Sequence, residues 1–393
     1  MSLTIQPVKR FQYLDSARGL AALSVITWHF FTSFVDFGNG SFVMKSPFHF
    51  FWYGEADVLF FFIHSGFILS YSYLGRQKTF TASTYIRFLI ERIFRIYPLF
   101  LFILIASFFL RHTLYPVSGG SYVTEHLRTF WQNDCDWELL IKQSILIVPI
   151  PAEANLRLIP QDWTLTVEII VGALIPLMGL LLKKSKWIYW ITVIALIKIL
   201  HFNTYIFEFA AGVFLFYHWP DITSAWSRLP KMIKAITLIF AVAFYSCFLR
   251  FSSLFVPGNI VFTPGIDRLI VTIGCCIFFC VIISSLTIQK ILSHTVLVKV
   301  GRVCYSIYLV HMLLLIAFGD QLLRILHNMV SMSQMGYLTI AFAIYMISTV
   351  GISFLTFALI EKPFNKYGKL VGKKCELYFN NKFGAFFQKK MPI

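Results

Sequence analysis

The sequence predicts an all-α, polytopic membrane protein with about ten transmembrane helices and both termini in the cytoplasm. Three observations predict this class: 58% of the 393 residues are hydrophobic, only 13% are charged, and basic residues gather between alternate apolar segments. Soluble domains carry about 25% charged residues and somewhat less than half apolar ones. A water-soluble globular protein is therefore excluded, and a mean hydropathy of +0.73 agrees with a membrane protein.

Apolar segments long enough to cross a bilayer recur along the chain, because a helix needs about 20 residues to span roughly 30 Å of hydrocarbon. The ten predicted spans are residues 18–37, 57–74, 95–112, 163–182, 187–202, 204–219, 233–251, 267–287, 303–324 and 337–360. The apolar segment 137–150 is interrupted by Glu138 and Lys142 and is too short to cross comfortably. We predict an interfacial or re-entrant helix there.

The net charge of +16 first suggests a nucleic-acid partner. With ten spans, however, 24 of the 34 Lys and Arg residues fall on the side of the two termini. Cytoplasmic loops of membrane proteins carry such an excess of basic residues, so the charge indicates orientation and no nucleic acid is expected. The basic, aromatic tail 361–393 is expected to lie in the cytoplasm against anionic lipid headgroups.

Span one carries Arg18 and His29, eleven residues apart. At 100° per residue both project from one helix face, and a rise of about 16 Å places His29 near the middle of the membrane. An imidazole there can serve as a general base. The alternative is a histidine that packs between helices and an arginine that snorkels to the interface.

Arg92 and Arg95 stand one turn apart at the predicted entrance of span three, in RFLIERIFRIYP. Paired guanidinium groups suit phosphate oxygens, which they bind bidentately. The alternative is simple anchoring of a helix end by basic residues on the cytoplasmic side.

Spans four and nine add further polar residues. Trp163 opens span four at the outer interface, in PQDWTLTVEIIVG, and Glu168 lies five residues deeper. His311, in span nine, lies at a depth comparable with His29. An ionisable residue in a span is costly and is therefore a functional candidate, with helix packing as the alternative.

His64 and Glu208 also lie within spans, and for both we favour a packing role. The sequence contains no P-loop, no G-x-G-x-x-G and no H-E-x-x-H, so neither an ATPase nor a zinc protease is indicated. The seven cysteines show no metal-binding spacing, and no metal site is predicted.

Together these segments resemble the acyltransferase-3 family of integral membrane O-acyltransferases. The opening LDSARGLAALSVITWH is similar to the family's L-D-x-x-R-G-x-A-A signature with its later histidine. FFIHSGFILS, RIFRIYP, DWTLTVE, YSIYLVH and EKP resemble further family segments in the same order. The resemblance covers most of the chain and makes residues 1–360 an acyltransferase-3-like transmembrane domain. His64 departs from the family, which more often has an apolar residue there.

The resemblance implies roles for seven residues. The catalytic residues would be His29, Arg18 and Glu168, the acyl-CoA-binding residues Arg92 and Arg95, and the acceptor-side residues Trp163 and His311. By the same resemblance, Glu168 also carries over to the acceptor side, and its position in the span would let it orient His29 or contact a hydroxyl.

The expected reaction moves an acyl group, by default acetyl, from cytoplasmic acyl-CoA to a hydroxyl of an extracytoplasmic or lipid-linked sugar. Acyl-CoA is then a co-substrate, no metal is needed, and the protein lies among lipids of a bacterial cytoplasmic membrane. Direct transfer and a covalent acyl intermediate both stay open. The competing class is a proton-coupled transporter with Arg18, His29 and Glu168 as a relay, although no inverted repeat is visible.

Overall fold

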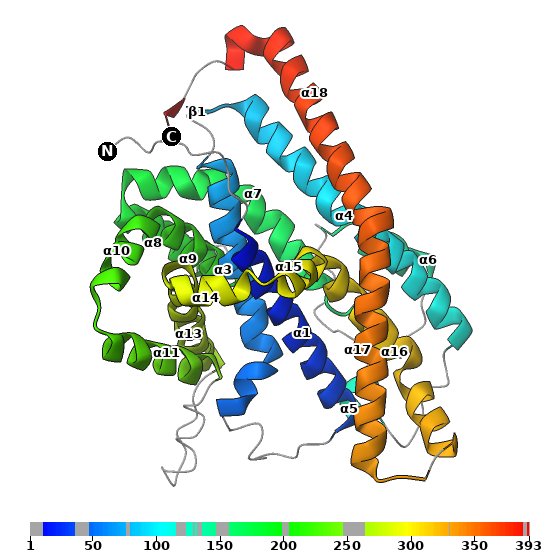
Figure 1. The fold of residues 1–393 in the computed structure, drawn as a ribbon. Coiled ribbons are helices and arrows are strands. Elements are labelled where there is room, and N and C mark those ends of the chain that lie inside the picture. The colour runs from blue at the N-terminus through cyan, green and yellow to red at the C-terminus, as the bar shows by residue number, and fades with distance from the viewer. Residues whose placement is uncertain are drawn as a thin grey trace.

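Helices account for nearly all of the described structure (Figure 1). This computed structural model describes residues 11–35, 47–75, 79–114, 123–128, 130–131, 136–146, 157–198, 204–246, 264–329, 331–387 and 391–392. The first half of the chain holds α1 (Gln12–Phe34), the 3-10 turn η1 (Pro47–Phe51), α3 (Gly54–Tyr73), β1 (Thr79–Phe80), α4 (Ala82–Leu114), α5 (Glu125–Arg128), α6 (Trp137–Ser144), α7 (Asp162–Lys184) and α8 (Lys186–Lys198). The second half holds α9 (Ile206–Tyr217), α10 (Trp219–Arg228), α11 (Lys231–Tyr245), α13 (Pro264–Ser284), α14 (Leu286–Leu292), α15 (Thr295–Arg302), α16 (Cys304–Met329), α17 (Gln334–Thr356), the π-helical turn η4 (Phe357–Glu361), α18 (Lys362–Phe387) and β2 (Met391–Pro392).

Each predicted span overlaps a helix over most of its described residues. Among the described residues, six helical segments are long and apolar enough to cross a membrane: α3, α4, α7, α13, α16 and the segment that begins with α17. The other four predicted spans correspond to α1, α8, α9 and α11, of which the last three have 13, 12 and 15 residues. The helices are those of a multi-pass membrane protein, while the total of ten spans stays a prediction.

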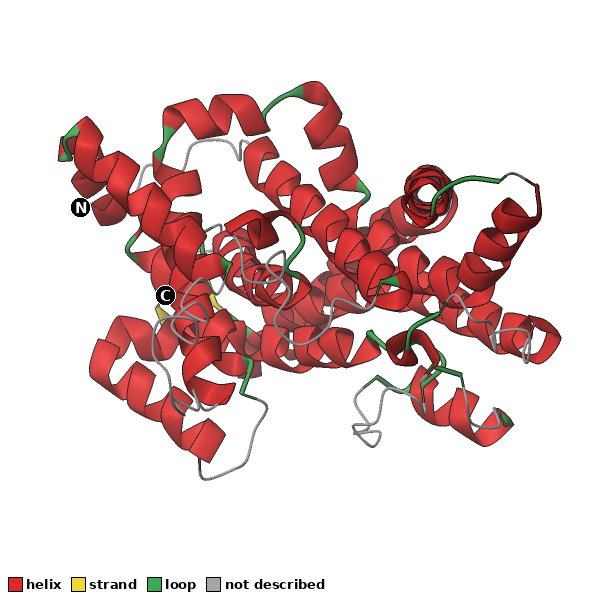
Figure 2. Ribbon diagram, turned by 90° about the horizontal axis from the view of Figure 1, so that it is seen from below, coloured by secondary structure: helices red, strands yellow, loops and turns green. Residues whose placement is uncertain are grey.

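Helices α1 and α3 form the centre of the molecule. α3 packs against α1, α7, α9 and α13, and α1 also packs against α15 and α16. Figure 2 shows the molecule from below and makes plain that helices form nearly all of the described chain. Aromatic side chains fill the contacts: the rings of Phe67 and Phe279 join α3 to α13 at 5.1 Å, and those of Phe30 and Tyr345 join α1 to α17 at 5.4 Å. The two central helices therefore have fixed positions relative to their neighbours.

Large apolar side chains also cover the outward faces of the helices. Examples on α8 and α4 are Trp187, Ile191, Phe102 and Phe109, all exposed. An exposed apolar surface of this extent is unfavourable in water and marks a surface made for another apolar phase. It is the surface that a lipid-facing helix presents.

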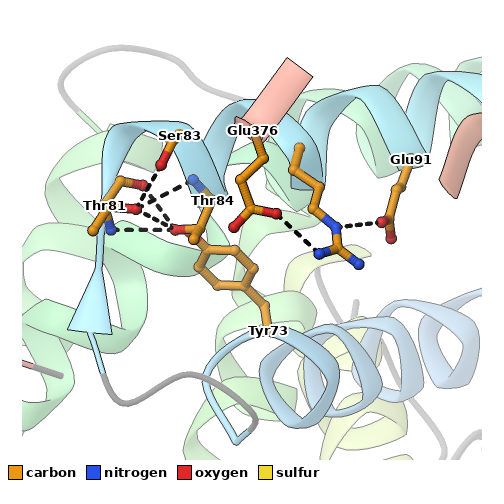
Figure 3. A network of polar contacts seen from close by, with 7 residues as sticks. Tyr73, Thr81, Ser83, Thr84, Glu91 and Glu376 are labelled. Atoms are coloured by element: carbon orange, nitrogen blue, oxygen red, sulfur yellow. Dashed lines mark hydrogen bonds and ion pairs between the residues drawn. The ribbon is translucent and has the colours of Figure 1, made fainter. Parts of the chain in front are cut away.

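Helix α4 is much longer than its predicted span, which was expected to begin at residue 95. It has 33 residues and begins at Ala82, where the Thr81 hydroxyl accepts a hydrogen bond from the Thr84 amide (Figure 3). A threonine that caps the first turn favours a helix start. An ion pair between Arg87 and Glu91, 2.7 Å apart at i and i+4, then supports the polar first half. Arg92 consequently lies about 15 Å inside the helix rather than at its entrance.

The structure describes parts of two further predicted segments, the apolar segment 137–150 and the tail 361–393. The segment 137–150 forms α6 over its first part, where Asp136 caps the helix by accepting from the Leu139 amide at 2.8 Å, and residues 147–150 lie outside the described residues. The tail 361–393 forms α18, which packs along α4, and β2, which pairs with β1. The tail therefore packs against the protein, and its predicted contact with lipid headgroups stays a prediction.

Candidate active site

Three arginines from two helices meet in one layer of the molecule. Arg18 of α1 and Arg92 and Arg95 of α4 form what we call the arginine cluster, in which Arg92 interacts electrostatically with both other arginines. Glu168 of α7 and Glu361 of η4 supply negative charge, because both interact with Arg18. Charges from four segments of the chain thus converge at one place.

A close approach of α1 and α15 positions Arg18. A Cβ atom on Gly19 would lie only 2.7 Å from the amide nitrogen of Gly301, so the two helices touch backbone to backbone at these glycines. Any larger side chain at Gly19 would separate the helices. The Arg-Gly pair of the opening motif therefore has a steric reason: the glycine brings Arg18 up to the start of α16, where Cys304 is one of its electrostatic neighbours.

Arg92 is the most enclosed member of the cluster. Its Nη2 donates to the backbone oxygen of Glu168 at 2.5 Å and lies 3.7 Å from the Glu168 carboxylate. A Cβ on Gly172 would lie 2.7 Å from the guanidinium carbon, so this glycine provides the space for the arginine. The buried Nε has no hydrogen-bond partner in the described part of the chain. Arg92 is therefore fixed in direction while one of its donors remains unused.

Arg18 and Arg95 have more unused hydrogen-bond donors than Arg92. Within the described residues, neither forms a hydrogen bond or an ion pair, although both interact electrostatically with Glu361. The Glu361 carboxylate instead accepts a hydrogen bond from Ser306 at 2.9 Å. Guanidinium groups with unused donors, held close together, suit a ligand that carries several negative oxygens.

Three histidines form a second layer, which we call the histidine cluster. The ring of His29 lies 5.3 Å from that of His311 on α16 and 6.2 Å from that of His126 on α5, with which it is stacked. His29 lies eleven residues beyond Arg18 on α1, about 16 Å along the helix. The two clusters are therefore separate, and the same two helices, α1 and α16, pass both.

The environment of His311 favours one tautomer. Its Nδ1 lies 3.2 Å from the backbone oxygen of Ile307, so a proton on Nδ1 has a partner and Nε2 is left as the acceptor. His311 is fully buried, and its Nε2 has no hydrogen-bond partner among the described residues. The same holds for Nδ1 of His29. Two adjacent imidazoles with unused nitrogen atoms can take up and return a proton.

A buried carboxylate holds the part of α1 that lies between the two clusters. Ser24 of α1 and Tyr245 of α11 both donate to Asp57 of α3, at 2.5 and 2.6 Å. In the structure Asp57 joins three helices and fixes the rotation of α1, and thus the direction of His29.

Glu168 and Trp163 lie apart from His29. The Glu168 side chain lies beside Arg92, a residue of the predicted donor site, and the predicted catalytic role of Glu168 stays a prediction. The Trp163 ring packs against Tyr205 at 4.9 Å, on another face of α7. The neighbouring Thr164 connects this end of α7 to α16, through a hydrogen bond of 2.8 Å with the hydroxyl of Tyr308.

Glu208 and His64, the two other candidates that the sequence places within spans, have packing partners. Glu208 is buried and accepts from Arg268 at 2.8 and 3.2 Å and from Thr272 at 2.9 Å, which satisfies its charge. Arg268 in turn covers the Tyr205 ring at 3.8 Å. His64 packs against Phe279, with ring centres 6.1 Å apart, and lies within electrostatic range of the arginine cluster.

Sequence reasoning missed two residues of the site. His126 follows a long connection, and no helical period relates it to His29. Glu361 was visible as the first residue of the EKP motif, but only the π-helical turn directs it toward Ser306 and the arginine cluster. π-Helical turns occur frequently at functional sites, and this one offers a signal for such a residue once the structure is available.

The fold and the two clusters define a class: a multi-pass helical membrane protein with a buried cationic site and a separate histidine site. Residues 11–358 match the acyltransferase-3 family, whose matching region is an acyltransferase domain. The chain belongs to this family and is a membrane acyltransferase. No curated protein and no solved structure matches the chain. All seven predicted site residues fall inside the matched region, whereas Glu361 and α18 lie beyond it.

Proposed function

We propose that the protein is an O-acyltransferase that moves an acyl group, by default acetyl, from acyl-CoA to a hydroxyl of a carbohydrate or glycolipid. One observation carries the proposal: helix α1 joins a group of guanidinium groups with unused donors, on α1 and α4, to two adjacent imidazoles with unused nitrogens, on α1 and α16. The first group suits a phosphorylated donor, and the second suits removal of a proton from a hydroxyl.

The donor occupies the arginine cluster in this proposal. Phosphate oxygens of acyl-CoA accept hydrogen bonds from Arg92 and Arg95, and Arg18 adds positive charge from α1. The pantetheine arm then follows α1 and α16 toward the histidine cluster. The distance of about 16 Å along α1 calls for a long flexible arm between phosphate and thioester, and acyl-CoA has one.

The chemistry takes place at His29. Neutral His29 accepts the proton of the acceptor hydroxyl while the hydroxyl oxygen attacks the thioester carbonyl carbon. The carbon–sulfur bond then breaks, and the proton passes from His29 to the departing sulfur, so that free CoA and an ester are formed. His311 lies beside His29 and supports the proton transfer from the acceptor side. A covalent acyl-histidine is the alternative route, and it predicts that labelled acyl groups stay on the protein when acceptor is withheld.

Glu168 and Trp163 complete the proposal. Glu168 balances the charge of Arg92 and keeps its guanidinium directed into the donor site. Trp163 stands at the end of α7 where an acceptor from the outer side would enter, and an aromatic ring offers a flat apolar face to a sugar. The acceptor is then an extracytoplasmic or lipid-linked sugar of the cell envelope, and the protein lies in the bacterial cytoplasmic membrane.

The direct test incubates purified protein with labelled acetyl-CoA and a panel of envelope glycans. The proposal predicts release of free CoA that depends on an acceptor, with label in the glycan. A transporter that uses Arg18, His29 and Glu168 as a relay would give electrogenic flux in vesicles without CoA release, and that result would contradict the proposal. Mass spectrometry of envelope glycans with and without the gene identifies the acceptor.

A further inference from the structure

Helix α18 lies beyond the part of the chain that matches the family, yet it packs along the same helix that carries Arg92 and Arg95. Figure 1 shows α18 beside the first half of α4, after a continuous path from α17 through η4. Most of its lysines are exposed, whereas Gly368 and Gly372 are buried against α4. The helix therefore has one defined contact face.

Two glycines one turn apart allow the close contact. A Cβ on Gly368 would lie 3.0 Å from the Phe94 ring, and a Cβ on Gly372 would lie 3.2 Å from the Arg87 side chain and 3.3 Å from that of Glu91. Pairs of small residues at i and i+4 let two helices approach closely and fix how they slide past each other. A larger side chain at Gly372 would push α18 away from α4.

Charged groups join the two helices at the same place. Arg87 donates to Glu376 of α18 at 3.0 Å and to Glu91 of its own helix at 2.7 Å, and Figure 3 shows both carboxylates directed at the guanidinium. All three side chains are partly exposed, so each ion pair contributes little to stability by itself. Their value lies in selecting one register of α18 on α4.

The contact face and the donor site lie on different faces of α4. At 100° per residue, Arg87, Glu91 and Phe94 share one face, while Arg92 and Arg95 project roughly 70–130° away from it. α18 thus supports α4 from behind while the arginines face the site. At its start, α18 follows Glu361, which interacts electrostatically with Arg95 and Arg18.

We propose that α18 is a positioning element of the acyl-donor site: Gly368, Gly372 and Glu376 hold α4 in the place that directs Arg92 and Arg95 at the phosphates of acyl-CoA. This inference rests on the proposed function. It assigns α18 a role in donor affinity, and none in the chemical step.

The test compares binding of two probes to full-length protein in detergent. Acetyl-CoA carries the phosphates, and S-acetylpantetheine lacks them. Gly372→Leu should weaken acetyl-CoA binding about 5- to 20-fold and leave S-acetylpantetheine binding within about twofold, because only the phosphates reach the arginines. The control is Gly351→Leu on α17, since a Cβ there has nothing within 4 Å.

A second variant guards against misfolding. Glu376→Lys places a positive charge beside Arg87 and should weaken acetyl-CoA binding about threefold, while Glu376→Asp should restore most of it. If wild-type protein, Gly372→Leu and Glu376→Lys all bind acetyl-CoA equally, the inference about α18 is wrong and the proposed function stands. Equal loss of both probes would also contradict it, because that indicates general damage. If wild-type protein binds no acetyl-CoA, the proposed function itself fails.

Discussion

The arginine cluster and the histidine cluster share helix α1 but are built in different ways. The arginine cluster gathers charges from α1, α4, α7 and η4, and Glu168 and Glu361 offset part of its positive charge. Among the described residues no carboxylate contacts His29 or His311, which lie beside each other, the stacked ring of His126 and the backbone oxygen of Ile307. One layer gathers charged side chains, and the other gathers imidazoles with unused nitrogen atoms.

In the proposed mechanism this difference separates donor binding from chemistry. A phosphate needs fixed positive charge, whereas a general base needs an uncharged imidazole at the start of the reaction. If both functions lay in one layer, the positive charge of the arginines would disfavour proton uptake by the histidine. A distance of about 16 Å along α1 reduces that repulsion, and in the proposed mechanism the donor itself would bridge it. Changes in the two clusters should therefore alter different kinetic constants.

The largest effect is expected at His29. His29→Ala removes the proposed base and should lower kcat by about 10³-fold, within the usual range for general bases, while acetyl-CoA affinity changes less than twofold. Steady-state kinetics together with a binding assay would measure both. Full activity in this variant would remove His29 from the mechanism.

The arginine pair should show the opposite pattern. Arg92→Ala combined with Arg95→Ala removes charge-assisted hydrogen bonds that contribute about 1.5–3 kcal/mol each, so donor affinity should fall at least about 100-fold. At saturating acetyl-CoA, kcat should stay within about fivefold of wild type. Unchanged CoA affinity would mean that these residues only anchor the helix.

A smaller effect is expected at Gly172, where the added side chain displaces the Arg92 guanidinium. Gly172→Val should raise the KM for acetyl-CoA about tenfold, with little change in kcat. Gly351→Val is the matched control, because Gly351 lies in a helix with free space around it. Equal KM values for the two variants would show that the position of Arg92 does not matter.

The smallest effect is expected on the acceptor side. Trp163→Ala should raise the KM for the acceptor about three- to fivefold and leave the KM for acetyl-CoA unchanged, because Trp163 contacts Tyr205 and lies away from both clusters. Trp163→Phe keeps an aromatic face and should restore most of the affinity. A change in donor KM instead would place Trp163 on the donor side.

Much of the site follows from sequence spacing, and the reason is helical geometry. Arg18 and His29 were expected on one face of one helix, and α1 carries them to two layers that other helices complete. Arg92 and Arg95 were expected as neighbours at one turn of α4, where the structure has them. Such local relations need only the helix period.

Relations between distant segments could not be predicted from the sequence. Arg92 lies beside Glu168 because α4 packs against α7. The early start of α4 at Ala82, which the threonines and the Arg87–Glu91 pair support, is likewise not revealed by hydropathy. The packing of α18 on α4 depends on Gly368 and Gly372. The composition of residues 361–393 indicated only a basic, aromatic tail. Contacts of this kind are set by tertiary packing.

The central claim is that one cluster binds the donor and the other performs the transfer. Binding of labelled acetyl-CoA, measured side by side for wild type, His29→Ala and the Arg92→Ala/Arg95→Ala double variant, tests it most directly. We predict wild-type affinity for His29→Ala, although this variant transfers almost nothing, and at least about 100-fold weaker binding for the double variant. Equal affinity in the double variant, or a comparable loss of binding in His29→Ala, would contradict the account.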